Sequence, residues 1–301
     1  MSDSRVFFAA NQHINPTNVC VLRNTCVFCS FARMPKEDGA YTRSLDEVFA
    51  EADAARDNPT REFHIVGGLH PKLRLEYYVD MFRGLKERHP QVMIKALTAV
   101  EVAHLARIEG MSTRDVLLAM KEAGVSTLPG GGAEVFSPAA RATIADRKLT
   151  GDEWLAVHRE AHALGIPSNC TMLYGHVETL EDRVDHLLAL RALQDETHGF
   201  LCYIPLAYHP DHNELGEAGA GTPMWLSYDQ IVSLIRGAGK EPVERDSLYQ
   251  PVRTFEDWVP GQASARPQGP AGPTFHLEPR RAAAARRRAL PVLSSAVDGA
   301  E

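Results

Sequence analysis

Short apolar runs alternate along this chain with longer segments whose apolar residues recur every three or four positions. The short runs predict β-strands, and the periodic segments predict amphipathic helices. Strands are expected at residues 6–14, 62–67, 92–98, 126–130, 168–174 and 200–206. Helices are expected between them at residues 45–56, 75–88, 114–123, 152–164 and 181–195, and later at 228–238. Apolar strands that alternate with helices predict a parallel sheet with right-handed crossovers.

Signals at the ends of the helices agree with this order. Ser44 and Glu47 form a capping-box pattern at the start of the first helix. Gly124 and Gly165 follow two helix ends, where a left-handed residue is favoured. The chain is therefore predicted to form an α/β barrel, whole or partial, with its functional residues at the carboxyl ends of the strands.

Three cysteines follow the first predicted strand: Cys20, Cys26 and Cys29. Three thiolates so close in sequence can bind one soft metal centre. A structural zinc site needs four protein ligands, and no fourth Cys or His follows at zinc-finger spacing. A four-iron, four-sulfur cluster held by three cysteines leaves one iron open to a substrate or cofactor. The pattern therefore favours such a cluster, whereas Cys170 and Cys202 lie in apolar strands and are predicted to be core.

Composition narrows the class of protein. The chain has 301 residues, of which 44% are hydrophobic, and a formal net charge of −7, which disfavours nucleic acid or an anionic membrane as partner. It has no run of eighteen apolar residues, and its five cysteines do not suggest a secreted disulfide framework. A cytoplasmic protein is expected. Residues 1–250 are predicted to form the barrel domain. Residues 251–301 are predicted to form a Pro-, Ala- and Arg-rich tail, disordered from residue 260, whose arginines could bind nucleic acid but are better explained as solvated.

Several sequence blocks resemble aminodeoxyfutalosine synthase, a family of radical S-adenosylmethionine (SAM) enzymes. They are Asn-Pro-Thr-Asn-Val-Cys at 15–20, His-Ile-Val-Gly-Gly-Leu-His-Pro at 64–71 and Lys-Ala-Leu-Thr-Ala-Val-Glu at 95–101, with further blocks at 128–134, 168–176, 204–210 and 239–249. The cysteine spacing is C-x5-C-x2-C, two residues longer than the usual C-x3-C-x2-C of this superfamily.

The resemblance implies a radical-SAM barrel with a 4Fe-4S cluster on Cys20, Cys26 and Cys29, and SAM on the open iron. It implies an external electron donor of the flavodoxin or ferredoxin type. The implied reaction adds the 5′-deoxyadenosyl radical to 3-[(1-carboxyvinyl)oxy]benzoate, a small carboxylated aromatic enol ether. Rearrangement and loss of bicarbonate then give aminodeoxyfutalosine, in menaquinone biosynthesis by the futalosine pathway. Neither nucleic acid nor a membrane is expected as partner.

Six further residues are expected to contact SAM. Phe28 would pack against the cluster or the adenine, or else belong to the core of the barrel mouth. Gly67 and Gly68 would admit the methionine amino group, or form an ordinary turn. Glu101 would accept hydrogen bonds from the ribose or the ammonium, or favour a helix start. Gly131 would offer its amide to a carboxylate and Glu134 would bind a ribose hydroxyl, with a simple turn as the alternative.

Two histidines at successive strand ends, His176 and His209, are expected to hydrogen-bond or protonate the carboxylated substrate, although a structural role is the common one for a single histidine. Asn169, Thr171 and Tyr174 alternate with Cys170 and Met172, and one of these sets should face the barrel interior.

Three functions remain open from the sequence: the synthase itself, a sister radical enzyme, or a decayed, non-catalytic paralogue. The sisters are cyclic dehypoxanthinylfutalosine synthase and the deazaflavin-precursor synthase. Family members carry a helical segment before the first strand and further strand and helix units near residue 217, where this chain has few residues. We therefore expect a partial barrel of six strands with an open gap, an aggregation-prone protein, and SAM cleavage poorly coupled to product.

Overall fold

The computed structural model describes residues 11–54, 60–219, 244–245 and 251–252. Contacts between Cα atoms group Met1–Pro260 into one compact unit, and all the described residues belong to it. Its elements in chain order are β1 (Asn11–Ile14), α1 (Leu45–Ala54), β2 (Glu62–Ile65), α2 (Leu75–Arg88), β3 (Met93–Ala96), α3 (Ala99–Glu109), α4 (Thr113–Glu122), β4 (Val125–Thr127), α5 (Pro138–Ile144), α6 (Gly151–Ala163), β5 (Ser168–Tyr174), α7 (Leu180–Thr197), β6 (Phe200–Ala207), α8 (Glu214–Glu217), β7 (Glu244–Arg245) and β8 (Pro251–Val252).

The six longer strands run parallel in sequence order. β1, β2, β3 and β4 form one hydrogen-bonded sheet, and β5 pairs with β6. A parallel bridge from Leu128, directly after β4, to Ser168 of β5 connects these two groups. The expected α/β fold with six parallel strands is therefore confirmed within the described residues, which also include the two-residue antiparallel pair β7–β8.

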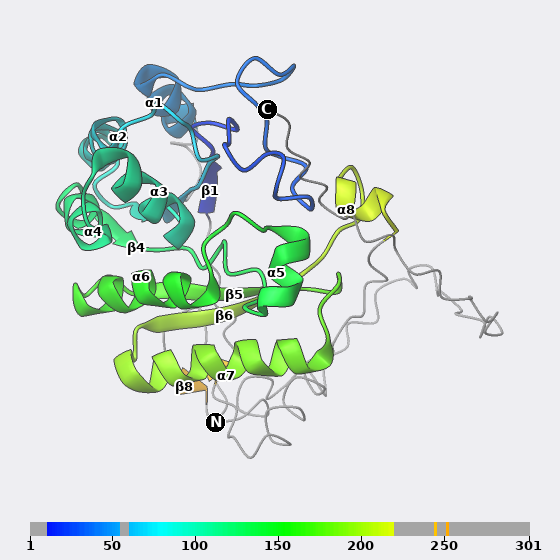
Figure 1. Cartoon of the computed structure of the whole chain (residues 1–301). Helices are drawn as coiled ribbons and strands as arrows, with labels where there is room; N and C mark the ends of the chain where they lie inside the picture. The colour runs from blue at the N-terminus through cyan, green and yellow to red at the C-terminus, as the bar shows by residue number, and fades with distance from the viewer. Residues whose placement is uncertain (1–10, 55–59, 220–243, 246–250, 253–301) are drawn as a thin grey trace, which may run out of the picture. The chain divides into compact units, whose positions relative to one another are not determined.

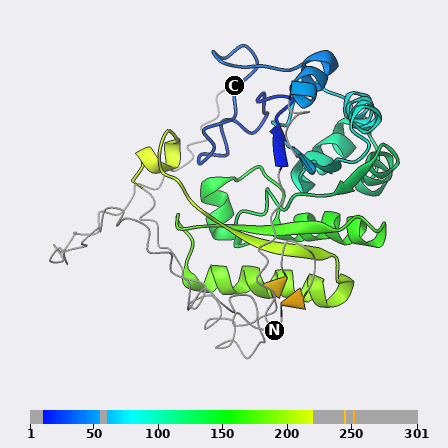
Figure 2. The same ribbon diagram turned by 180° about the vertical axis from the view of Figure 1, so that it is seen from behind.

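Helices cover one side of these strands. Helix α1 packs against α2, α2 against α4, α4 against α6, and α6 against α7 (Figures 1 and 2). The apolar side chains that alternate along the strands lie in the core under these helices, among them Ile14, Phe63, Ile65 and Ile94. The intervening residues of the same strands, such as Glu62 and Lys95, point to the opposite face. No helix in the described part of the chain is long and apolar enough to span a bilayer.

The predicted helix signals are present. Ser44 and Glu47 exchange hydrogen bonds at the start of α1, with the Glu47 carboxylate accepting from the Ser44 amide at 2.7 Å. Gly124 and Gly165 take φ values of +107° and +72° after α4 and α6. The bounds predicted for α2 and β5 agree with the structure, and the other predicted elements are shifted by a few residues at their ends.

Three helices of the described residues, α3, α5 and the short α8, have no predicted counterpart. The segment Thr98–Glu101, expected to follow the third strand, begins α3 with a capping box, which confirms the alternative role of Glu101 at a helix start. Leu97 has a φ of +57° and turns the chain sharply between β3 and this helix. Helix α5 begins with the cap Ser137 and with Pro138 in its first turn. The first half of the strand predicted at 6–14, the helix predicted at 228–238 and nearly all of the predicted tail lie outside the described residues.

Candidate functional site

The cysteine loop, residues 15–29, follows β1 and is held through its backbone by segments from the whole barrel. Asn15 Nδ2 donates to the carbonyl oxygen of Val66 at 2.8 Å, at the end of β2. Backbone hydrogen bonds connect Cys20 N to Arg33 O, Val21 N to Leu69 O, Val27 N to Ile144 O and Leu215 N to Val27 O, at 3.0 to 3.1 Å. The loop is therefore fixed although it contains neither helix nor strand.

The three cysteines of this loop are free thiols on one small hydrophobic cluster. Cys26 is buried within the cluster, and the partly buried Cys20, Phe28 and Cys29 pack against it. Burial raises the pKa of the Cys26 thiol to about 11, against a smaller lowering by the nearby ammonium of Lys148. Iron must therefore displace the Cys26 proton when it binds, since the thiolate is the ligand.

These cysteines suit a polynuclear cluster better than a single ion. In the described part of the chain, no three Cys, His, Asp or Glu side chains are arranged to hold one metal ion. A four-iron cluster binds its cysteines through different irons, so the thiols need to border a common volume rather than meet at a point. Cys20, Cys26 and Cys29 border the same hydrophobic cluster of residues. The donor set fits a 4Fe-4S cluster with one iron open.

Lys148, which the sequence analysis missed, brings two predicted site residues together. Its Nζ lies 2.6 Å from Glu134 Oε1 and 5.5 Å from the ring centroid of Phe28. Burial alone would lower the pKa of Lys148, but Glu134 and Cys26 raise it above its usual value. Lys148 lies in a polar loop without periodicity, so only the folded chain shows that its ammonium is buried beside the cysteines.

Glu134 is held in an unusual backbone conformation. Its φ is +49°, in the left-handed region that side chains other than glycine rarely adopt, and its carbonyl accepts a 2.8 Å hydrogen bond from Leu173 N of β5. Strain of this kind concentrates at functional sites. The carboxylate is nearly buried and reaches Lys148 from the segment between β4 and α5.

Gly67 and Gly68 allow the cysteine loop to approach β2. A Cβ on Gly68 would lie 2.3 Å from the carbonyl oxygen of Val19, and one on Gly67 would lie 2.9 Å from that of Thr17. The Gly68 amide donates to Thr17 O at 2.8 Å, and the Gly67 amide donates to Glu101 Oε1 at 2.8 Å. Both amides are thus used within the protein, and both glycines set the distance between the loop and the strand.

Glu101 is buried and fully bonded. Its Oε2 accepts from the amide and the hydroxyl of Thr98, both at 2.7 Å, and its Oε1 accepts from Gly67. Burial raises the pKa of Glu101 to about 7, although each of these bonds lowers it. The side chain joins the start of α3 to the turn after β2.

Gly131 lies in the turn after β4, with its carbonyl accepting from the Trp154 indole at 3.2 Å. A Cβ there would meet the methyl carbon of Thr98 at 3.1 Å. The turn is therefore tight against α3 without the backbone collision seen at Gly68.

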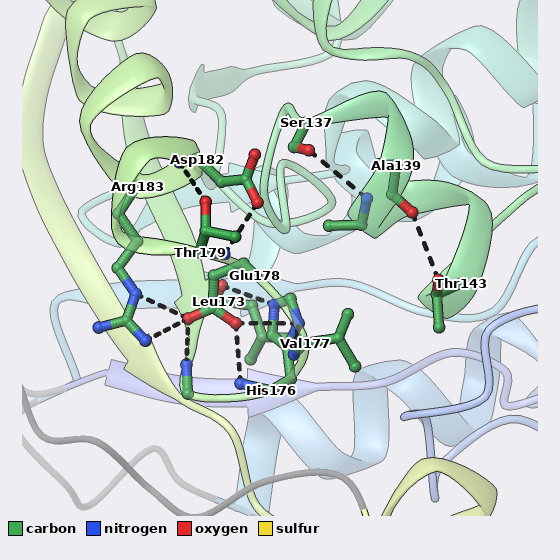
Figure 3. A network of polar contacts seen from close by, with 12 residues as sticks. Ser137, Ala139, Thr143, Leu173, His176, Val177, Glu178, Thr179, Asp182 and Arg183 are labelled. Atoms are coloured by element: carbon green, nitrogen blue, oxygen red, sulfur yellow. Dashed lines mark hydrogen bonds and ion pairs between the residues drawn. The ribbon is translucent and has the colours of Figure 1, made fainter. Parts of the chain in front are cut away.

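His176 belongs to a buried polar network in the turn between β5 and α7 (Figure 3). Its Nδ1 accepts from Val177 N at 2.7 Å, and its Nε2 lies 3.0 Å from Leu173 O. Burial lowers the pKa of His176, which favours the neutral ring with the proton on Nε2. Glu178 accepts from the amides of Gly175 and His176 and from Arg183 Nε, at 2.6 to 2.8 Å. The network fixes the shape of this turn.

His209 lies apart from His176. Its side chain is 86% exposed, whereas that of His176 is 0% exposed. The ring of the intervening Tyr208 packs edge-on against His176, and the Tyr208 hydroxyl donates to Asn213 at 2.6 Å. The structure therefore does not bring the two predicted histidines together.

The alternation along β5 assigns its two faces. Cys170 belongs to the core under the helices, whereas Leu173 belongs to the small cluster around Cys26. Asn169, Thr171 and Leu173 therefore face the barrel interior. Tyr174 lies on the helix side with Cys170, where Arg183 of α7 stacks on its ring at 5.5 Å.

Comparison with known proteins agrees with this geometry. A family model described as the radical SAM superfamily matches residues 14–190, which is more than half of the chain. The chain belongs to the radical SAM superfamily. It is therefore a transferase of this superfamily. The cofactors of the superfamily are a 4Fe-4S cluster and SAM.

Relatives of this radical SAM chain divide between two activities. An aminodeoxyfutalosine synthase of Streptomyces coelicolor is 46% identical, with 88% of this chain and 86% of that protein covered. A 5-amino-6-(D-ribitylamino)uracil–L-tyrosine 4-hydroxyphenyl transferase of Methanopyrus kandleri is 33% identical, with 83% and 85% covered. A crystal structure of methylornithine synthase (PylB) shares the fold, with a TM-score of 0.59 at 16% identity over 76% of this chain and 61% of that chain.

Proposed function

We propose that this radical SAM enzyme is an aminodeoxyfutalosine synthase, acting on 3-[(1-carboxyvinyl)oxy]benzoate in menaquinone biosynthesis in the cytoplasm. The observation that carries this proposal is the 46% identity to the Streptomyces enzyme over 88% of the chain. When bound, the cluster and SAM supply the 5′-deoxyadenosyl radical that adds to the vinyl group of the substrate.

In this proposal Cys20, Cys26 and Cys29 hold the cluster, with Phe28 packed beside it. The placement of the three thiols on one hydrophobic cluster supports these roles. Glu134, next to Lys148, binds the SAM ribose, and the Gly131 amide binds a carboxylate. Gly67, Gly68 and Glu101 contribute by fixing the loop and turn that border SAM, since their polar groups are already bonded.

The two histidines take different roles in the proposal. His209, exposed at the end of β6, is placed to contact the substrate, whereas His176 positions the β5–α7 turn through its two ring nitrogens. An external flavodoxin or ferredoxin supplies the electron. Exposed apolar side chains at Val21, Phe31 and Met34, close in sequence to the cysteines, support docking of such a donor near the cluster.

Coupling between SAM cleavage and product is expected to be poor. The alignment with the Streptomyces enzyme runs over 337 positions although it uses 88% of the 301 residues, so several tens of positions have no counterpart in this chain. Ile204 and Leu206 of β6 are 37% and 42% exposed. Water that reaches the substrate through an incomplete wall would favour loss of the radical before addition.

The second candidate is the tyrosine transferase activity, which the relationship to the Methanopyrus protein favours. The two reactions differ in their products. The enol ether would retain the adenosyl group in a stable adduct, whereas the tyrosine reaction would release 5′-deoxyadenosine and transfer a 4-hydroxyphenyl fragment to the ribitylaminouracil.

The deciding experiment is mass spectrometry of the anaerobically reconstituted protein after incubation with SAM and dithionite. One sample receives the enol ether, and a second receives L-tyrosine with 5-amino-6-(D-ribitylamino)uracil. We expect an adenosyl adduct in the first sample, with free 5′-deoxyadenosine in excess over it. Product in the second sample alone would assign the transferase activity instead. Cleavage of SAM with neither product would leave both proposals without support.

A further inference from the structure

A row of polar side chains crosses the face of the β1–β4 sheet that points away from the helices. His13 is in register with His64, His64 with Lys95, and Lys95 with Thr127. Residues in register on parallel strands share a face, so these four side chains point to the same side. We call them the inner polar row. Their apolar neighbours along the same strands lie in the helix-covered core.

An ion pair and two stacked rings connect the members of the row. Lys95 Nζ lies 2.8 Å from Glu62 Oε2, and these side chains are only 11% and 10% exposed. Glu62 Oε1 lies 3.7 Å from His64 Nδ1, and the rings of His13 and His64 stack with centroids 4.6 Å apart. Barrel interiors are usually filled with branched apolar side chains, and a buried ion pair seldom stabilises more than an apolar pair would. Stability does not explain the row.

Two buried polar atoms on this side lack a partner. Thr127 is 2% exposed, and its Oγ1 has no hydrogen-bond partner among the described residues. Asn169 of β5 is 5% exposed, faces the interior, and its side-chain oxygen also lacks a partner there. A buried polar group left unpaired destabilises the folded protein. Both atoms point to a polar ligand: the Thr127 hydroxyl can donate to it, whereas Asn169 Oδ1 can only accept.

The charges of the row favour an anion. Lys95 already neutralises Glu62, whose pKa stays below its usual value because His64 and Lys95 outweigh the effect of burial. An added cation would have to compete with Lys95 for this carboxylate. An added anion can accept from Lys95 and from the Thr127 hydroxyl.

We propose that the inner polar row, with Lys95 held in place by Glu62, binds a carboxylate of the organic substrate inside the barrel. This inference rests on the proposed function, whose substrate carries two carboxylates, and assigns one of them to named residues. His13 precedes the first residue of the cysteine loop by two positions, so the substrate lies next to the site of the cluster and SAM. The row selects the substrate, while the loop above it supplies the reactive cofactors.

The first test measures binding without turnover. The reconstituted protein with SAM and no reductant is titrated calorimetrically with 3-hydroxybenzoate and with the neutral 3-hydroxybenzamide. We expect the benzoate to bind at least about tenfold more tightly, as a charge-assisted hydrogen bond requires. Equal affinities for the two probes would overturn the proposal.

Two variants assign this binding to the row. Thr127→Val removes a hydroxyl without a partner, so the protein should unfold no more easily than the wild type while benzoate binds about fivefold more weakly. Glu62→Gln/Lys95→Met removes both charges together, which avoids leaving one of them buried alone, and should weaken benzoate binding about tenfold or more. Benzoate affinity unchanged in either folded variant would overturn the proposal.

Thr171→Val is the matched control for stability. The Thr171 hydroxyl donates to Gly130 O at 2.6 Å, so its removal should destabilise the fold where Thr127→Val does not. The same unfolding experiment on both variants shows whether the Thr127 hydroxyl is unpaired in the free protein.

The inference and the proposed function can fail separately. In one outcome the enol ether gives no adduct, L-tyrosine binds to the wild type, and the double variant no longer binds L-tyrosine. The row is then a carboxylate site and the proposed function is wrong. If the double variant forms the adduct as fast as the wild type at limiting enol ether, the proposed function stands and the inference is wrong.

Discussion

The cysteine loop and the segments that follow β3 and β5 use their polar groups in opposite ways. In the loop, backbone groups bond to distant segments, and the thiols of Cys20, Cys26 and Cys29 form no disulfide. At the start of α3 and in the turn after β5, the side chains of Glu101 and His176 are themselves occupied by bonds within the protein. The difference separates residues that can bind a cofactor from residues that hold the binding groups in place.

The largest expected effect is on the thiols. Cys26→Ser should reduce the iron content of the reconstituted protein from about four atoms per chain to below one, because the hydroxyl is a poor ligand for iron. Iron and sulfide analysis after anaerobic reconstitution measures this. Cys170→Ala, a cysteine of the helix-covered core, should keep the full cluster. Full iron loading of Cys26→Ser would remove this cysteine from the ligand set.

The next effect concerns the glycine that lets the loop approach β2. Gly68→Ala places a methyl group against the Val19 carbonyl, so we expect a loss of about 2–3 kcal/mol of unfolding free energy together with weaker iron binding. Gly131→Ala meets only a side-chain methyl, at 3.1 Å, and should lose less than about 1 kcal/mol. Urea denaturation compares the two variants, and equal losses would contradict the close approach of the loop.

Glu101 should make stability depend on pH. The pKa of Glu101 is raised to about 7 in the folded protein. Its contribution to the free energy of unfolding is therefore complete below the pKa of Glu101 in the unfolded chain, and it is lost as the pH rises through 7. Relative to Glu101→Gln, the wild type should therefore lose roughly 2 kcal/mol between pH 5 and pH 8.

The matched control is Glu47→Gln, in the exposed capping box of α1. The pKa of Glu47 is lowered, chiefly by its hydrogen bond from the Ser44 backbone, so Glu47 stays ionised across the same range. Denaturation at pH 5 and at pH 8 should give the same difference in unfolding free energy between this variant and the wild type. A flat profile for Glu101→Gln as well would show that Glu101 ionises normally.

The smallest effects separate the two histidines. His176→Ala removes both ring hydrogen bonds and should cost about 1–2 kcal/mol, whereas His209→Ala should change stability by less than about 0.5 kcal/mol. If His209 contacts the substrate, its variant should slow adduct formation with the cluster intact. Thermal unfolding and adduct yield, measured on the same preparations, test both expectations.

The sequence predicted most of the barrel because strand and helix periods were strong in most of its elements. Helix α3 was missed because its buried residues, including Val100, Val102 and Leu105, continue the apolar character of β3. The sequence pattern therefore places Thr98, which caps α3, at a strand end. Only the reversal of the backbone at Leu97 separates the two elements.

The candidate site was predicted less completely than the fold. The three cysteines are evident from spacing, but the burial of a turn side chain depends on contacts that spacing does not contain. His176 and His209 occupy equivalent places after β5 and β6, yet Tyr208 packs over one of them while the other is exposed. Lys148 acquires its role from Glu134, fourteen positions away, through an ion pair that no local pattern indicates.

The contact between α8 and the cysteine loop affects when the enzyme can mature. Leu215 N donates to Val27 O at 3.0 Å, and Arg23 pairs with Glu214 at 3.2 Å. The thiols thus leave the ribosome long before the residues that secure their loop, by roughly ten to forty seconds at ordinary rates of synthesis. During this interval the nascent cysteines are open to oxidation. Iron and sulfide are therefore best delivered once α8 has been synthesised and has reached the loop.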